Sequence, residues 1–353
     1  MDDLDLLAGA LRTSPGNQAP VPTDRWEPVL DLADAHHLLP VLWRSGLDAG
    51  WWVPVPLGAR DAIRSHLDAG TTLPALLLQD AYEANQARTA DLEAQGQAAL
   101  DALGAAGIEA IALKGLHGLQ AGWWPDPATR VMRDLDILVR ASEAPRAAAA
   151  LAELGYVPAR EAPGDPAADH EVTTTHLPGR AGSIDLHIAL LVSRWRTVLP
   201  VEGVLAAGAP MSTTDAVIHG IAHAQLQDEA HRFAQIPLRA LHELSVVAGR
   251  ADLTVDWSAV RAAFARAGAE AALDAHLQLA RTLFDAEVPP PRGRVRAAGH
   301  ERLARVLADH PAASRRYERA VYAPRALSTG RMTELYGPGN GWAQRARHLT
   351  RRR

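Results

Sequence analysis

Apolar positions at two different spacings divide the chain into helical flanks and a short central stretch. Residues 74–106 carry apolar side chains at helical spacing, which predicts one long helix. The uninterrupted apolar runs at 108–113 and 137–139 are typical of short buried strands. Helical periodicity dominates again before position 91 and after position 211, so we expect the strands to form a small central unit.

Glycines, prolines and capping residues mark the ends of further elements. Residues 142–155 predict a helix that a glycine ends, and Glu171–Leu177 and Ser183–Leu190 predict two strands joined by a turn. In the flanks, Val29–Trp43 and Trp257–Phe284 each predict an amphipathic helix. Several helices around a few strands predict an α+β fold.

The composition narrows the classes of protein and of site. The chain has 353 residues and a formal net charge of −5, so it can form more than one domain and offers no general attraction for nucleic acid or an anionic membrane. It contains no cysteine, which excludes disulfides, thiolate catalysis and zinc–thiolate sites. The acidic start does not resemble a signal peptide, and no apolar run reaches the roughly 20 residues of a membrane helix, so we expect a cytoplasmic protein.

Two aspartates begin the second apolar run. Asp134 and Asp136 are two residues apart in a predicted strand, so their carboxylates lie on one face. Carboxylates that close repel each other, and a bound cation such as Mg²⁺ or Mn²⁺ makes the arrangement favourable. Taken alone, a D-x-D pattern is more typical of a solvated strand end. A third strand-borne carboxylate, Asp185, favours the metal interpretation, because a strand paired beside the first would bring it to the same cluster.

Basic residues accompany these aspartates. Lys114 is the only lysine in the chain and precedes Gly115 at the end of the first predicted strand, where a compact ammonium and a close backbone approach suit phosphate binding. Arg130 and Arg133 lie just upstream of the aspartates, where a guanidinium group suits pairing with a carboxylate or a phosphate. The alternatives are a lysine retained by chance, an ordinary turn glycine and a structural ion pair at Arg133.

Together these residues resemble the nucleotidyltransferase superfamily. They are similar to a poorly characterised branch with the signature L-K-G…R…D-L-D-I-L-V, whose members often lie beside peptide-modification or polysaccharide-assembly enzymes. The matching residues are Leu113-Lys114-Gly115, Trp124-Pro125-Asp126-Pro127, Arg130 and 134–139. The resemblance covers about residues 95–191. The chain departs from the wider superfamily at Lys114-Gly115, where most members carry Gly-Ser.

The resemblance implies a small mixed-sheet nucleotidyltransferase core with helical flanks. The regions that we expect are an N-terminal helical region at 1–91, the core at 92–210, a C-terminal helical domain at 211–290 and a helical or irregular tail at 291–353. The last nine residues of the tail are basic, but the acidic remainder of the chain argues against a nucleic-acid arm.

The resemblance also implies Mg²⁺-dependent (or Mn²⁺-dependent) transfer of a nucleoside monophosphate from an NTP, with ATP favoured, to a hydroxyl of an unidentified acceptor, with release of pyrophosphate. Three carboxylates would hold two metal ions, and the last of them would accept the hydroxyl proton: Asp134, Asp136 and Asp185. Four residues would bind the nucleotide: Lys114, Gly115, Arg130 and Arg133. The missing Gly-Ser hydroxyl keeps an alternative open, a catalytically inactive module that binds a nucleotide or a partner in a biosynthetic complex.

Histidines near these elements allow two interpretations each. His187 shares a strand face with Asp185, so it either supports the metal ligands or is an ordinary half-buried histidine. His219 and His223 are four residues apart on a predicted helix, which is a metal-ligand spacing, but the glutamate of the zinc-protease pattern is absent. We interpret this pair as packing or acceptor-side residues.

Overall fold

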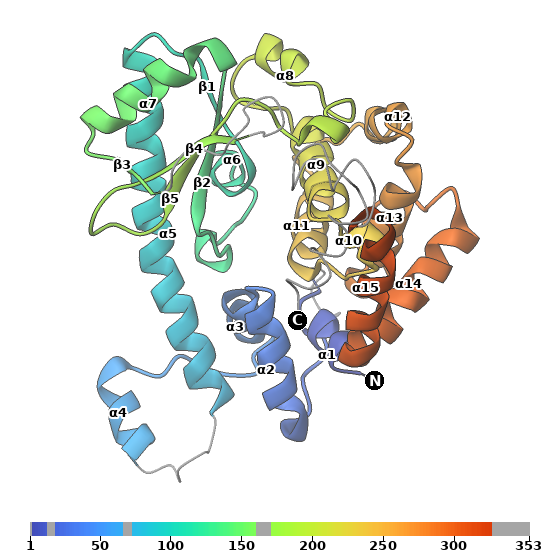
Figure 1. Ribbon diagram of the computed structural model, residues 1–353. Helices are drawn as coiled ribbons and strands as arrows, with labels where there is room; N and C mark the ends of the chain where they lie inside the picture. The colour runs from blue at the N-terminus through green and yellow to red at the C-terminus, as the bar shows by residue number, and fades with distance from the viewer. Residues whose placement is uncertain (1, 13–17, 66–72, 160–170, 327–353) are drawn as a thin grey trace, which may run out of the picture.

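A five-stranded mixed sheet organises the upper part of the molecule in Figure 1. The computed structural model describes residues 2–12, 18–65, 73–159 and 171–326, so the basic tail at 345–353 lies outside the described residues. The strand order is β1-β2-β5-β4-β3; β2 and β5 are parallel, and the other neighbours are antiparallel. The bounds are β1 Ala110–Ala112, β2 Asp134–Val139, β3 Val157–Pro158, β4 Glu171–His176 and β5 Ser183–His187. The predicted α+β fold with a small mixed sheet is confirmed.

Two helices cover one face of this sheet, α5 Pro74–Ala105 and α7 Ala144–Glu153 (Figure 1). The long helix α5 begins at a proline. Proline lacks a backbone N–H, and the first turn tolerates this because an N–H there would have no partner within the helix. It ends before Gly107, whose φ of +68° suits a residue without a side chain. Leu92 of α5 and Ile137 of β2 are fully buried in the cluster that joins these elements.

The opposite face of the sheet packs against helices from both flanks. Ile111 and Leu138 lie on this face and share one buried cluster with Leu7 near the N-terminus and Phe264 in the C-terminal helices. The cluster takes residues from all four regions expected from the sequence, so the sheet and both flanks share a core. The region boundaries at positions 91, 210 and 290 stay predictions.

The flanks consist of short helices joined by tight turns. Before α5 lie α1 Asp3–Ala10, α2 Trp26–Ala35, α3 Leu39–Asp48 and α4 Leu57–Ser65, and α6 Lys114–Gln120 follows β1. After the sheet come α8 Val201–Ala207, α9 Thr213–Ala222, a π-helical turn His223–Gln227, α10 Ala230–Phe233, α11 Leu238–Ala248, α12 Trp257–Arg266, α13 Glu270–Phe284, α14 Arg294–Asp309 and α15 Pro311–Ala326. Among these described helices, none combines the length and the apolar character that crossing a bilayer requires.

Both helices expected in the flanks are interrupted. The stretch Val29–Trp43 contains the end of α2 and the start of α3, because His37 adopts a left-handed conformation with φ of +57°. The stretch Trp257–Phe284 divides into α12 and α13 at Gly268, whose φ is +63°. Apolar spacing continues across both breaks because the paired helices bury their faces in the same cluster.

Buried histidines in the C-terminal helices predict a loss of stability in mild acid. His242 is 6% exposed and packs edge-on against Phe284. Burial, followed by the nearby charge of Arg130, lowers the pKa of His242 from 6.5 to about 4. The unfolded chain therefore binds a proton at His242 at a higher pH than the folded chain does. The contribution of this histidine to the free energy of unfolding is complete above pH 6.5 and is lost as the pH falls toward 4.

We expect His242→Phe, which keeps a ring against Phe284 but removes the titratable group, to reduce this loss. Between pH 7 and pH 5 the variant should lose about 2 kcal/mol less unfolding free energy than the wild type, measured by urea unfolding at both pH values. His310→Asn removes an exposed histidine and should leave the pH dependence unchanged. Equal losses in His242→Phe and the wild type would contradict the prediction.

Candidate active site

The parallel pairing of β2 and β5 places the predicted carboxylates side by side. Asp136 pairs in register with Asp185, and Asp134 lies two residues earlier on β2. Residues in register on neighbouring strands point to the same face, and so do residues two apart on one strand. Leu135 and Ile137 point to the α5 face, so the three aspartates lie on the face that turns toward the C-terminal helices. The prediction that a strand paired beside β2 brings Asp185 next to Asp134 and Asp136 is confirmed.

Asp136 is the most deeply buried of these carboxylates, at 3% exposure. Its Oδ1 accepts a hydrogen bond from Lys114 Nζ at 2.6 Å and lies 2.9 Å from His187 Nε2. Burial alone would raise the pKa of Asp136, but the hydrogen bond from His187 and the charge of Lys114 outweigh it and hold this pKa well below its usual range. Asp136 is therefore a charged group, and His187 supports it directly.

Lys114 and Gly115 form the first turn of α6. Lys114 has a φ of +47°, a conformation that costs a non-glycine residue free energy and is characteristic of functional sites. Gly115 lies against Met132: a Cβ at this position would be 2.4 Å from the Met132 sulfur. A side chain at position 115 would push on Met132 in the loop that enters β2, so glycine avoids a close contact at this position.

Asp185 has a different environment from Asp136. Burial, followed by the charges of Glu171, Asp136 and Asp134, raises the pKa of Asp185 to about 6, while a hydrogen bond from Thr174 acts in the opposite direction. Its Oδ1 is buried and has no hydrogen-bond partner among the described residues. A buried carboxylate oxygen without a partner beside two other carboxylates would be stabilised by a cation.

The donor set fits Mg²⁺ or Mn²⁺ in its chemistry, because these ions prefer carboxylate oxygens. The positions of these donors do not form a complete metal site: among the described residues, no three His, Asp or Glu side chains lie close enough together to hold a metal ion. At Asp136 the Lys114 ammonium supplies the neutralising charge. Metal binding by Asp134, Asp136 and Asp185 therefore stays a prediction.

A cavity of about 450 Å³ opens beside these groups. The core contributes most of the residues predicted from the sequence to its lining: Lys114, Gly115, Arg130, Arg133, Asp134 and Asp136. Asp185 is not among the lining residues. The remaining walls come from α9, the π-helical turn, α11 and the α2–α3 corner. The cavity thus lies where the sheet meets both helical flanks.

Arg130 fastens the loop before β2 to the C-terminal helices. Its side chain is buried, its Nε lies 3.0 Å from Glu243 Oε1 of α11, and its guanidinium lies over the Trp124 ring. Burial lowers the pKa of Arg130, although the charge of Glu243 opposes this shift. The Trp124 ring also packs against Gly118 of α6, so this tryptophan serves packing.

Polar residues of α5 hold the same loop from the other side, and the sequence reading did not identify them. Tyr82 donates to Asp126, Asn85 donates to the backbone carbonyls of Ala128 and Arg130, and Arg88 donates to that of Met132. These three residues recur every third position on a predicted helix, which places them near one stripe. That spacing was the available signal.

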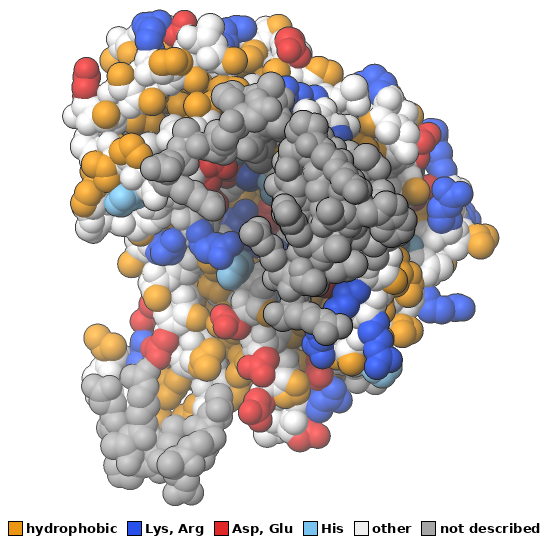
Figure 2. All heavy atoms as spheres, in the orientation of Figure 1, with side chains coloured by type: hydrophobic (Ala, Val, Ile, Leu, Met, Phe, Trp, Pro, Cys, Tyr) orange, Lys and Arg blue, Asp and Glu red, His pale blue; other side chains and the backbone are white. Residues whose placement is uncertain are grey.

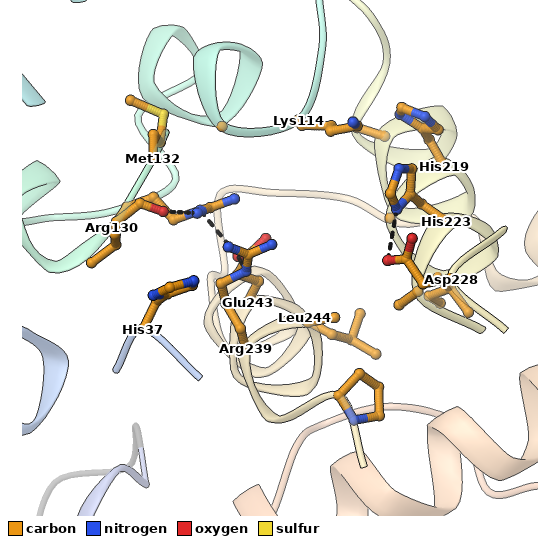
Figure 3. A pocket seen from close by; sticks show the side chains of 18 of the residues that line it. His37, Lys114, Arg130, Met132, His219, His223, Asp228, Arg239, Glu243 and Leu244 are labelled. Carbon is orange, nitrogen blue, oxygen red and sulfur yellow. Dashed lines mark hydrogen bonds and ion pairs between the residues drawn. The ribbon is translucent and has the colours of Figure 1, made fainter. Parts of the chain in front are cut away.

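On the far walls of the cavity, the sequence indicated roles only for His219 and His223, as packing or acceptor-side residues. His219 Nε2 lies 3.0 Å from the Leu190 carbonyl, and His223 Nδ1 lies 3.1 Å from Asp228. Figure 3 shows these histidines near Lys114, with Arg130, Glu243, Arg239 and His37 gathered on the other side. The helices that carry these residues reach the core only in the folded chain, so local sequence contained no signal for Arg239, Glu243 or His37.

A comparison with family models assigns the chain. The model of the family described as "Uncharacterised nucleotidyltransferase" matches residues 22–285, so the chain belongs to this nucleotidyltransferase family. The match extends beyond the core into both helical flanks that line the cavity. Neither the curated proteins nor the solved structures gave a match.

Gly115→Ala tests the packing of the lysine–glycine turn. The added Cβ would overlap the Met132 sulfur, so we expect a destabilisation of about 1–3 kcal/mol, measured by urea unfolding. Gly104→Ala is the matched control, because this exposed α5 glycine has no atom within 4 Å of the added Cβ. The control should be neutral or stabilising by up to about 1 kcal/mol. Equal effects of the two substitutions would contradict the packing role of Gly115.

Proposed function

We propose that this protein transfers a nucleoside monophosphate from an NTP, with ATP favoured, to a hydroxyl group of an acceptor, with release of pyrophosphate. The observation that carries the proposal is the ionised Asp136, held by Lys114 and His187 at the edge of a cavity in a member of a nucleotidyltransferase family. The Asp136 carboxylate would be placed to hold a metal ion, and the Lys114 ammonium beside it would be placed to bind the triphosphate.

Two basic groups of the core would bind and orient the nucleotide. Lys114, on the first turn of α6, would meet the negative charge that develops on the leaving pyrophosphate. Gly115, which has no side chain, would let the phosphates approach the backbone. Arg133 lines the cavity and is exposed, so it is available to the triphosphate, whereas Arg130 is already paired with Glu243.

The transfer step requires one proton acceptor. The acceptor oxygen would attack the α-phosphorus, the bond from this phosphorus to the bridging oxygen would break, and pyrophosphate would leave. Asp185 would take the hydroxyl proton, and a pKa of about 6 suits exchange of a proton near neutral pH. Two Mg²⁺ or Mn²⁺ ions, held by Asp134, Asp136 and Asp185, would supply charge neutralisation and acidify the hydroxyl.

One observation favours a second candidate, a module that binds a nucleotide or a partner without catalysis. The Lys114–Asp136 ion pair, at 2.6 Å, already satisfies the carboxylate that a metal would use. A chain that relied on this pair would bind without a metal and would release no pyrophosphate. Metal-independent binding of ATP would favour this second candidate.

Ligand-dependent stability tests the nucleotide site directly. We expect Mg²⁺ and ATP together, but neither alone, to raise the thermal unfolding midpoint of the wild type, because a ligand at about 100 times its Kd adds about 2.7 kcal/mol to the folded state. The double variant Asp134→Asn/Asp136→Asn should lose this shift. Asp252→Asn, an exposed aspartate paired with Arg250 outside the cavity, should keep it. A shift that survives in the double variant would contradict the site.

The single lysine permits a second test. Lys114 is the only lysine in the sequence, and its side chain is 26% exposed, so an amine-reactive acetylating reagent modifies one lysine that mass spectrometry can follow. We expect Mg²⁺-ATP to slow this modification at least about fivefold, since bound phosphates would occupy the ammonium. The amino terminus serves as the internal control and should be modified at an unchanged rate. An equal rate for Lys114 with and without Mg²⁺-ATP would remove Lys114 from the nucleotide site.

A further inference from the structure

A group of two arginines and a histidine lies on the side of the cavity away from Lys114. Arg239 of α11, Arg133 of the loop before β2, and His37 of the α2–α3 corner all line the cavity, and Figure 3 shows Arg239 and His37 near Arg130. In Figure 2, basic side chains and a histidine gather on this face at the lower end of the sheet, above α3. Three segments far apart in the sequence thus bring their basic residues to one place.

Among the described residues, only Glu243 forms an ion pair with the arginines on this side of the cavity. Glu243 is shared: its Oε1 lies 3.0 Å from Arg130 Nε and 3.6 Å from Arg239 Nε. Arg133 has no hydrogen bond or ion pair from its side chain among the described residues. Two guanidinium groups, those of Arg130 and Arg239, therefore share one close carboxylate, and Arg133 pairs with none among the described residues, in a chain whose net charge is −5. Gathering like charges is unfavourable unless an anion joins them.

His37 reports the positive potential of this group. Burial lowers the pKa of His37, and the charges of Arg239, Arg133 and Arg130 lower it further, against a smaller opposing effect of Asp34. His37 is therefore neutral at pH 7 and can donate a hydrogen bond without adding charge. Its left-handed backbone conformation, φ +57°, is the kind of strain that surrounding structure maintains at binding sites.

We propose that Arg239 and His37, with the charge of Arg133 adding to the positive potential, form a subsite for an anionic group of the acceptor, a phosphate or a carboxylate. The inference rests on the proposed function and adds the substrate class. The nucleotide phosphates belong beside Lys114, Gly115 and the aspartates, whereas Arg239 and His37 come from the flanking helices. Guanidinium groups suit phosphate and carboxylate alike, because their donors form a planar fork.

Calorimetric titration of the full chain tests this subsite without the natural acceptor. The protein is saturated with Mg²⁺ and α,β-methylene-ATP, which cannot release pyrophosphate, and inorganic phosphate or acetate is then added. At least one of the two anions should bind alongside the nucleotide analogue. Arg239→Gln should weaken that anion at least about tenfold and change the affinity for the analogue by less than about twofold.

Arg44→Gln is the matched control. Arg44 is 46% exposed and pairs with Asp48 four residues on, as Arg239, 43% exposed, pairs with Glu243, but Arg44 does not line the cavity. It should leave both affinities unchanged. Glu243→Gln should act in the opposite direction, tightening the anion several-fold, because it removes the shared carboxylate. A weaker or unchanged anion affinity in Glu243→Gln would overturn the charge argument.

The remaining outcomes separate this subsite from the proposed function. Phosphate that displaces the nucleotide analogue would assign Arg239 to the triphosphate and overturn the acceptor subsite, while the proposed function stands. Failure of both anions to bind the wild type would also overturn the subsite. If the analogue itself does not bind, the proposed function fails, and the acceptor role of Arg239 fails with it, whatever the anions do.

Discussion

Asp136 carries its charge in a buried position, and that charge is stabilised by Lys114 and His187, which reach it from two other elements. Lys114 lies at the start of α6 and His187 at the end of β5. Their contacts with Asp136 therefore join β2 to the connection between β1 and β2 and to the parallel strand β5. Removing either partner would leave a buried charge less well compensated, which costs several kcal/mol. The position of α6, the parallel pairing and the left-handed turn at Lys114 all serve this one carboxylate.

Helix α5 makes the approach to this site rigid. Its apolar face packs under the sheet, while its polar residues hold the two loops that lead into the carboxylate-bearing strands. Asn85 binds the loop before β2, and Asp91 and Gln95 bind the turn before β5 through Ala181. A helix that carries both contacts fixes the register in which Asp136 and Asp185 stand side by side.

The cavity belongs to the whole fold and not to the sheet alone. One wall carries the lysine–glycine turn and the aspartates, and the others carry residues of α9, α11 and the α2–α3 corner. The buried cluster that joins the sheet to both flanks keeps these walls in place. The family match from residue 22 to residue 285 covers the same elements, so the shared unit includes the helices that line the cavity.

The sequence by itself determined the strand-borne aspartates, the lysine–glycine turn and the α+β class, because strand alternation, glycine turns and apolar runs are local properties. It also indicated the family through the combined motif of Leu113-Lys114-Gly115, residues 124–127, Arg130 and residues 134–139. Tertiary structure decided that Lys114 neutralises Asp136, that Glu243 serves both Arg130 and Arg239, and that His37 faces the same cavity. The Lys114–Asp136 contact joins residues 22 positions apart and the Arg130–Glu243 contact joins residues more than 100 positions apart, so only the packing of the helices on the sheet brings these pairs together. Arg239 and Glu243 are four positions apart on α11, and it is the tertiary contact with Arg130 that makes Glu243 a shared partner.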